Sequence, residues 1–211
     1  MALIRKENKI RKYLFIMIGI FFILFGLISL TYKYVKELNL NKLEEKSIEL
    51  YLEKEHTQEE QEETIEQEDI KVEKKEEQVI IDYIGVIEIP KINLKKGIVS
   101  SDSKYNNVNK SIYTISNSTF PNEEEISHII LAGHSGNSYI SYFRNLKKLK
   151  KDDLIYLYYN NQTYIYSISK TYEVEKTGSI AVGIYAKDAM TLITCVDNSN
   201  KQLVIVAMIV E

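Results

Sequence analysis

Short runs of alternating or apolar residues, separated by turn-forming residues, fill the sequence from residue 85 to residue 210. The runs with β-branched and aromatic residues, which predict strands, are 85–89, 95–100, 129–132, 153–159, 163–172, 189–194 and 203–210. Asn160 and Asn161 predict a tight hairpin turn, whereas 107–116 and 139–149 are the segments expected to be helical. Short strands joined by short turns predict a mainly β fold, a closed or nearly closed β-barrel with one or two short helices.

The only cysteine in the 211 residues, Cys195, follows the strand predicted over residues 189–194. Residues 196–201 are mostly polar and are typical of a turn, so Cys195 is expected at the end of a strand, where its side chain can face a groove. Free cysteines are also among the most often buried residues, so packing is the competing interpretation. A thiol with a pKa of roughly 8.5 is mostly protonated at neutral pH, and a neighbouring imidazolium makes it a usable nucleophile.

His134 is the candidate partner of the thiol. It follows the apolar strand predicted over residues 129–132 and is preceded by Gly133, which allows a tight turn. One cysteine and one loop histidine elsewhere in the sequence form the pattern expected of a cysteine acyl-transfer enzyme. His128 is an alternative base, but it begins a strand and lacks the neighbouring glycines. Two polar residues are candidates for orienting the ring, Ser135 and Asn137.

The segments Leu-Ala-Gly-His at 131–134 and Thr-Leu-Ile-Thr-Cys at 191–195 resemble the motifs of the sortases, membrane-bound cysteine transpeptidases of Gram-positive bacteria. The similarity includes residues 84–92 and extends from Tyr83 to Glu211. It implies a small β-barrel of about eight strands.

The resemblance also implies a reaction. Cys195 would attack the threonine carbonyl of a Leu-Pro-x-Thr-Gly-like sorting signal on a surface protein, and His134 would protonate the leaving amine. A peptidoglycan precursor or another amine acceptor would then receive the acyl group, whereas transfer to water would make the chain a hydrolytic thiol protease. No cofactor is implied, and one cysteine with three histidines does not provide a usual zinc site.

The sequence departs from the family at Gln202, which occupies the position of the sortase arginine. Loss of one oxyanion donor costs about 3 kcal/mol in other enzymes. Gln202 keeps an amide donor but no charge, and Lys201 should point to the opposite face of the strand. The alternative hypothesis is therefore a catalytically weak or inactive sortase-like binding module at the membrane. Thr194 is a weaker candidate for substrate contact, and Arg144 is expected on a solvated helix.

An uncharged stretch from Tyr13 to Tyr32 precedes the predicted barrel. About 20 residues, rising about 1.5 Å each, span the hydrocarbon core of a membrane. The basic residues before this stretch are Arg5, Lys6, Lys9, Arg11 and Lys12. The positive-inside rule then predicts a cytoplasmic tail (1–12), a single-pass transmembrane signal anchor (13–35) and an extracellular C-terminal domain at the cell membrane. A cleaved signal peptide is the competing interpretation, but no small-x-small cleavage site follows the apolar run.

Residues 36–79 are expected to form an acidic tether, which precedes a catalytic domain at 80–211. Between residues 36 and 78 there are 16 acidic residues and 7 lysines, with no glycine or proline, which is typical of a solvated spacer. The catalytic domain contains 13 acidic and 14 basic residues. Such a neutral domain argues against a nucleic-acid partner, which requires a basic face.

Overall fold

The computed structural model describes residues 2–210 except 61–80, 178–182, 184 and 186. Its contacts divide the chain into two compact units, Met1–Leu43 and Glu44–Glu211. Helix α1 (Ala2–Glu60) provides the first unit and also the beginning of the second, which contains all the strands. The second unit therefore includes helical residues that the sequence assigns to the tether.

The membrane span expected over residues 13–35 is not confirmed. Within the part of the chain that the structure describes, no helix is long and apolar enough to cross a membrane.

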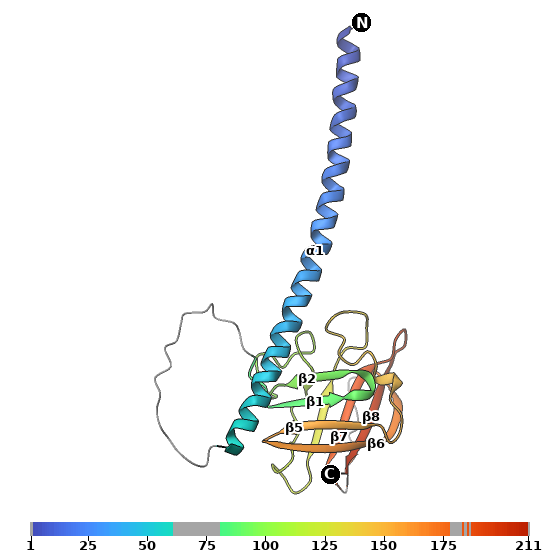
Figure 1. Ribbon diagram of the computed structural model, residues 1–211. Helices are drawn as coiled ribbons and strands as arrows, with labels where there is room; N and C mark the ends of the chain where they lie inside the picture. The colour runs from blue at the N-terminus through green and yellow to red at the C-terminus, as the bar shows by residue number, and fades with distance from the viewer. Residues whose placement is uncertain (1, 61–80, 178–182, 184, 186, 211) are drawn as a thin grey trace. The chain divides into compact units, whose positions relative to one another are not determined.

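Eight strands form one sheet in the second unit (Figure 1). They are β1 (Gly85–Ile89), β2 (Leu94–Ile98), β3 (Tyr113–Thr114), β4 (His128–Ala132), β5 (Leu154–Tyr159), β6 (Gln162–Glu175), β7 (Ala189–Cys195) and β8 (Lys201–Ile209), in the spatial order β2-β1-β5-β6-β8-β7-β4-β3. Ile98 at the end of β2 forms a bridge with Ile112, directly before β3, so the two edges of the sheet meet. The predicted mainly β, nearly closed barrel is thus confirmed.

Alternate residues of each strand fill the barrel interior, as the pleat of a strand requires. The fully buried core includes Ile129 and Leu131 of β4, Leu192 of β7 and Ile205 of β8. Residues between these positions face the outside of the sheet. The neighbouring strands β4 and β7 are parallel, so their carboxyl ends lie at the same end of the barrel.

The hairpin expected around Asn160 and Asn161 is present. Both residues have positive φ, 49° and 58°, the left-handed conformation that a two-residue hairpin turn needs.

Both helical segments expected in the barrel domain differ from the prediction. Residues 107–116 form turns and β3, because the side chain of Asn106 bonds both the N–H and the carbonyl of Thr114 and so replaces helical bonds. In 139–149 only a 3-10 turn, η2 (Leu146–Lys148), is formed. The N–H of Phe143 donates to the carbonyl of His134 instead of to a helical partner. A second 3-10 turn, η1 (Pro90–Ile92), joins β1 to β2.

Candidate active site at the ends of three neighbouring strands

The parallel pairing of β4 and β7 brings the predicted histidine and cysteine together. Ala132 is paired with Ile193, and the N–H of Gly133 donates to the carbonyl of Ile193 at 3.1 Å. His134 and Cys195 each lie two residues beyond this pair. Since adjacent strands are about 4.8 Å apart, the imidazole and the thiol are on neighbouring chain segments at the same end of the barrel.

Gln202 lies on the other side of the cysteine. In the antiparallel β7–β8 ladder it is paired directly with Cys195, so both side chains are on the same face of the sheet. Lys201 points to the opposite face, as expected, and its Nζ lies 3.5 Å from Oε2 of Glu173. His134, Cys195 and Gln202 are all partly exposed. The structure thus places Cys195 and Gln202 side by side on β7 and β8, with His134 in the loop after β4 at the same end of the barrel.

A row of apolar side chains runs beside Cys195 and Gln202. It is formed by paired positions on four strands, namely Ala132, Ile193, Val204 and Tyr172. Ile193 and Val204 are buried, whereas Tyr172 is half-buried. Of these four side chains, Ala132 and Tyr172 are the partly exposed ones.

The ring of His134 is held by a residue that the sequence did not single out. Its Nε2 lies 3.1 Å from Oδ1 of Asn109. An amide oxygen accepts hydrogen bonds, so Nε2 of His134 is the donor in this contact. Asn109 belongs to the stretch that the sequence predicted to be helical. The asparagines in and beside this stretch were the available sequence signal for a loop, since asparagine side chains commonly form hydrogen bonds with nearby backbone in turns.

Thr194 connects the two strand ends from the inside. Its side chain is 4% exposed, and its hydroxyl donates to the carbonyl of Gly133 at 2.7 Å. A Cβ at Gly133 would lie 2.9 Å from the ring of Phe143, so a larger residue would displace either that ring or the loop. Both residues therefore fix the backbone on which His134 is mounted. The sequence-based role of Thr194 in substrate contact stays a prediction.

The turn after Cys195 is tied to the histidine loop through Asp197. Its carboxylate accepts from the hydroxyl of Ser135 at 3.3 Å and pairs with Nζ of Lys147 at 2.8 Å. The hydrogen bond and the charge of Lys147 lower the pKa of Asp197. Ser135 thus bonds to the cysteine turn, and Asn109 orients the histidine ring.

The two alternative residues lie elsewhere. His128 begins β4, and its Nε2 lies 2.8 Å from the hydroxyl of Thr191, with its ring edge-on to Tyr185. Burial lowers the pKa of His128. Arg144 lies in a turn and not on a helix. Its guanidinium donates to the carbonyls of Gly136 and Ser138 in the histidine loop. Arg144 therefore stabilises that loop and does not take the position of the family's arginine.

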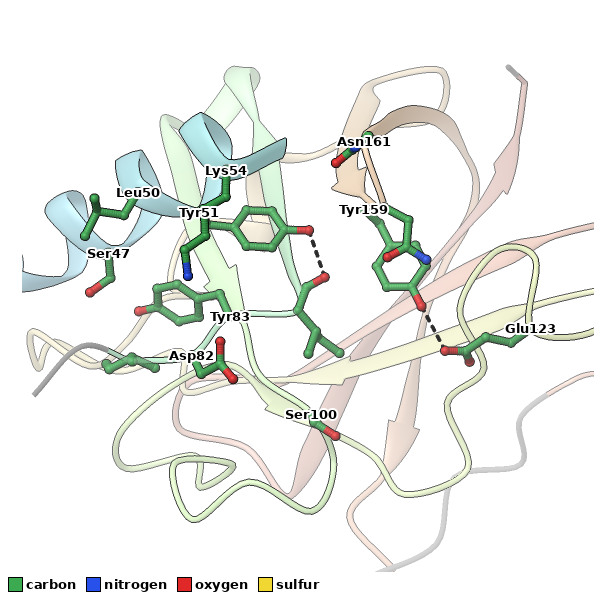
Figure 2. Close-up of a pocket in the computed structure, with 13 residues that line it drawn as sticks. Ser47, Leu50, Tyr51, Lys54, Asp82, Tyr83, Ser100, Glu123, Tyr159 and Asn161 are labelled. Carbon is green, nitrogen blue, oxygen red and sulfur yellow. Dashed lines mark hydrogen bonds between the residues drawn. The ribbon is translucent and has the colours of Figure 1, made fainter. Parts of the chain in front are cut away.

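A cavity of about 820 Å³ lies at the other end of the barrel. Its lining includes Tyr159 and Asn161 at the β5–β6 turn, together with Tyr51 of α1 (Figure 2). The β6–β8 register places the opposite end of β6, at Glu175, beside the start of β8 and hence beside Cys195. The cavity is therefore separate from the cysteine and histidine. Within the described ranges, no group of three or more His, Cys, Asp or Glu side chains is arranged to hold a metal ion.

Comparison with known proteins decides the family. The model of the sortase domain matches residues 87–210, which include all three candidates. The chain belongs to the sortase family. Sortase A of Bacillus anthracis is 32% identical over 127 residues, which are 57% of this chain and 57% of that protein. The chain thus spans little more than half the length of this curated sortase.

Solved sortase structures share the fold. Sortase C1 from Streptococcus agalactiae is 29% identical, with a TM-score of 0.54 over 64% of this chain and 72% of that one. Sortase A from Corynebacterium diphtheriae is 25% identical, with a TM-score of 0.54 over 64% of each chain. These sortases have class A and class C names, so the likeness extends across classes.

Proposed function

We propose that this sortase is a cysteine transpeptidase that cleaves a Leu-Pro-x-Thr-Gly-like sorting signal and transfers the surface protein to an amine of the cell wall. The observation that carries the proposal is that Cys195 is paired with Gln202, and that His134 follows the strand parallel to that of Cys195, at the same end of the barrel. A nucleophile, a base and an amide donor thereby lie at one end of the barrel.

The acylation step begins with transfer of the thiol proton to Nδ1 of His134. The sulfur of Cys195 then forms a bond to the threonine carbonyl carbon, and the carbonyl oxygen becomes an oxyanion. When the oxyanion collapses, the carbon–nitrogen bond breaks and His134 protonates the leaving amine. The product is a thioacyl enzyme and a free peptide with a new amino terminus.

The second step transfers the acyl group to an amine. The incoming nitrogen attacks the thioester carbon, its proton passes to His134, and the carbon–sulfur bond breaks to regenerate the cysteine. A peptidoglycan precursor or a neighbouring surface protein is the proposed source of this amine. If water resolves the thioester instead, the same residues perform hydrolysis.

Gln202 supports a second candidate, a sortase-like binding module with little or no turnover. It faces Cys195 directly, where the family has arginine. An amide can donate to the oxyanion, but a charged guanidinium forms stronger hydrogen bonds to it. The retained cysteine and oriented histidine favour the enzyme.

We also propose that residues 13–35 anchor the chain in the cell membrane of a Gram-positive bacterium, with the barrel outside. Support comes from the uncharged stretch, the basic residues before it, and the exposed apolar side chains of α1, among them Phe15, Phe21 and Phe25. Alkaline extraction of membranes and protease treatment of intact cells test this arrangement. Release of the full chain at high pH would contradict it.

The test of the reaction uses the full chain in detergent micelles and a panel of sorting-signal peptides. Intact mass should show a thioacyl adduct on wild type and none on Cys195→Ala. Addition of glycine oligomers or peptidoglycan stem peptides should then release a ligated product. Peptide binding without an adduct, together with acylation of Gln202→Arg, would assign the natural chain to the binding module.

A further inference from the structure

The beginning of the second unit is helical and packed on the barrel. Residues 44, 48 and 51 of α1 lie on one helix face, as their spacing requires. Nζ of Lys96 on β2 pairs with Oε2 of Glu44 at 2.6 Å. Ile48 is 6% exposed and packs with Tyr83. The hydroxyl of Tyr51 donates to the carbonyl of Ile84 at 2.9 Å (Figure 2).

The ion pair at the start of this face is largely removed from solvent. The side chains of Glu44 and Lys96 are only 14% and 21% exposed. Burial raises the pKa of Glu44, although the charge and hydrogen bond of Lys96 oppose this shift. A carboxylate buried to this extent needs its cation, so the two side chains are held in one geometry.

Lys96 also contacts the loop that carries the catalytic histidine. Its Nζ lies 4.7 Å from the centre of the Tyr142 ring, within cation–π range. Burial raises the pKa of Tyr142 above its ordinary value, and the charge of Glu44 adds to the shift. Glu44, Lys96 and Tyr142 thus form one electrostatic cluster, which joins α1 to the connection between β4 and β5.

Tyr142 is attached to both supports of His134. Its hydroxyl donates to the carbonyl of Lys110 at 3.4 Å, and Lys110 follows Asn109, the residue that holds the ring. The next residue, Phe143, donates its N–H to the carbonyl of His134 at 3.1 Å. Movement of Tyr142 therefore displaces the imidazole through its backbone and through its hydrogen-bond partner.

We infer that Glu44, Lys96 and Tyr142 form a brace that positions His134, so that the helix leading to the barrel is a working part of the active site. This inference rests on the proposed cysteine chemistry. The three residues touch no substrate and act through the histidine. A misplacement of about 1 Å in a catalytic group can lower a rate about 100-fold, so loss of the brace should lower the acylation rate.

The chain offers a matched control on the same strand. Lys95 also pairs with a glutamate, Glu88, at 3.2 Å, and also lies over a tyrosine, at 5.3 Å from the centre of the Tyr158 ring. It faces away from Tyr142, because consecutive residues of β2 point to opposite sides. Lys95→Met therefore removes the same types of contact without touching the brace.

The experiment compares the full-length variants Lys96→Met, Lys96→Arg and Lys95→Met. Lys96→Met should lower the acylation rate at saturating peptide about tenfold, with KM unchanged. Lys96→Arg keeps the positive charge and should restore the rate. The rate of Lys95→Met should stay within about twofold of wild type. The double variant Glu44→Gln/Lys96→Met should show the same tenfold loss without a buried unpaired carboxylate, which separates positioning from unfolding.

A substrate-free measurement separates this inference from the proposed function. Alkylation of Cys195 by iodoacetamide, followed against pH, reports thiolate formation whether or not any peptide is cleaved. Lys96→Met should shift this pH profile and the imidazole NMR signals of His134, whereas Lys95→Met should leave both unchanged. Equal profiles for the two variants, or a change in melting temperature alone, would overturn the brace.

Discussion

At one end of the sortase barrel, where β4 and β7 end and β8 begins, lie three partly exposed side chains, those of His134, Cys195 and Gln202. At the other end, aromatic residues close the β5–β6 turn. Tyr159 at that turn is 8% exposed, stacks on Phe120 with ring centres 5.0 Å apart, and donates to Glu123 at 2.9 Å. At the end that carries Cys195, the corresponding contacts are individual hydrogen bonds between loops, such as the one between His134 and Asn109.

If the proposed function is right, this difference separates the residues of the reaction from those that stabilise the fold. The cavity lies at the aromatic end, so cavity size is no guide to the chemistry of this chain. Substitutions at the catalytic end should change the rate more than the free energy of unfolding, because few contacts are lost. Substitutions at the aromatic end should do the reverse.

The largest expected effect is that of His134→Gln, with His128→Gln as its matched control. Removal of the base should lower the acylation rate by about 10² to 10⁴. His128 lies at the opposite end of β4 and bonds Thr191, so its loss should cost about 1 kcal/mol of stability and leave the rate within about twofold. Acylation kinetics and urea unfolding of both variants measure this contrast. Equal losses of rate would remove the distinction between the two ends.

Gln202→Arg should produce the next largest effect, an increase in rate. A guanidinium opposite Cys195 would give the oxyanion a charged donor, worth up to about 3 kcal/mol or about 100-fold. Lys201→Arg is the control, because it places the same group on the opposite face of β8. The ratio kcat/KM for the best peptide measures both. A lower rate in Gln202→Arg would indicate that the natural site is adapted to the neutral amide.

The sequence predicted the strands and the paired motifs because both are local signals. Alternation of β-branched residues marks β7, and Gly133 before His134 marks the end of β4. The register between distant strands then follows from the fold, and it brings Cys195 beside Gln202 and the loop of His134 to the same end of the barrel.

What the sequence could not predict depends on side-chain bonds between distant segments. Asn109 was assigned to a helix, since nothing local shows that its amide holds His134 25 residues away. The ion pair of Glu44 with Lys96 likewise has no local signal, because the two residues are 52 positions apart and meet only after β2 is in place. Without knowledge of a partner such as Lys96, an acidic stretch is interpreted as a solvated tether.

Asn109→Ala tests the hydrogen bond between Asn109 and the ring of His134. Loss of the acceptor leaves Nε2 of His134 without its partner, so the ring should rotate and the rate should fall about tenfold at unchanged KM. Asn109→Asp keeps an acceptor oxygen and should restore most of the rate. Acylation kinetics with melting temperatures distinguish this result from unfolding. If Asn109→Asp is as slow as Asn109→Ala, the bond does not orient the ring.

Tyr159→Phe at the aromatic end should have the smallest effect on rate and a measurable effect on stability. Loss of the hydroxyl bond to Glu123 should cost about 1 kcal/mol, with acylation unchanged. Burial, with the bond to Glu123, raises the pKa of Tyr159 to about 12. Below about pH 10 the folded and unfolded chains both keep the phenolic proton, so its contribution to stability is complete.

Above that pH the unfolded chain loses the phenolic proton first, and stability should fall as the pH approaches the folded value. Tyr159→Phe has no phenol at this position, so its free energy of unfolding should decline less over the same range. Some decline remains, because burial also raises the pKa of Tyr166. Urea unfolding at neutral and alkaline pH measures the difference between the two slopes. Parallel slopes would mean that Tyr159 ionises alike in both states, and the aromatic end would then be more open to water than its packing indicates.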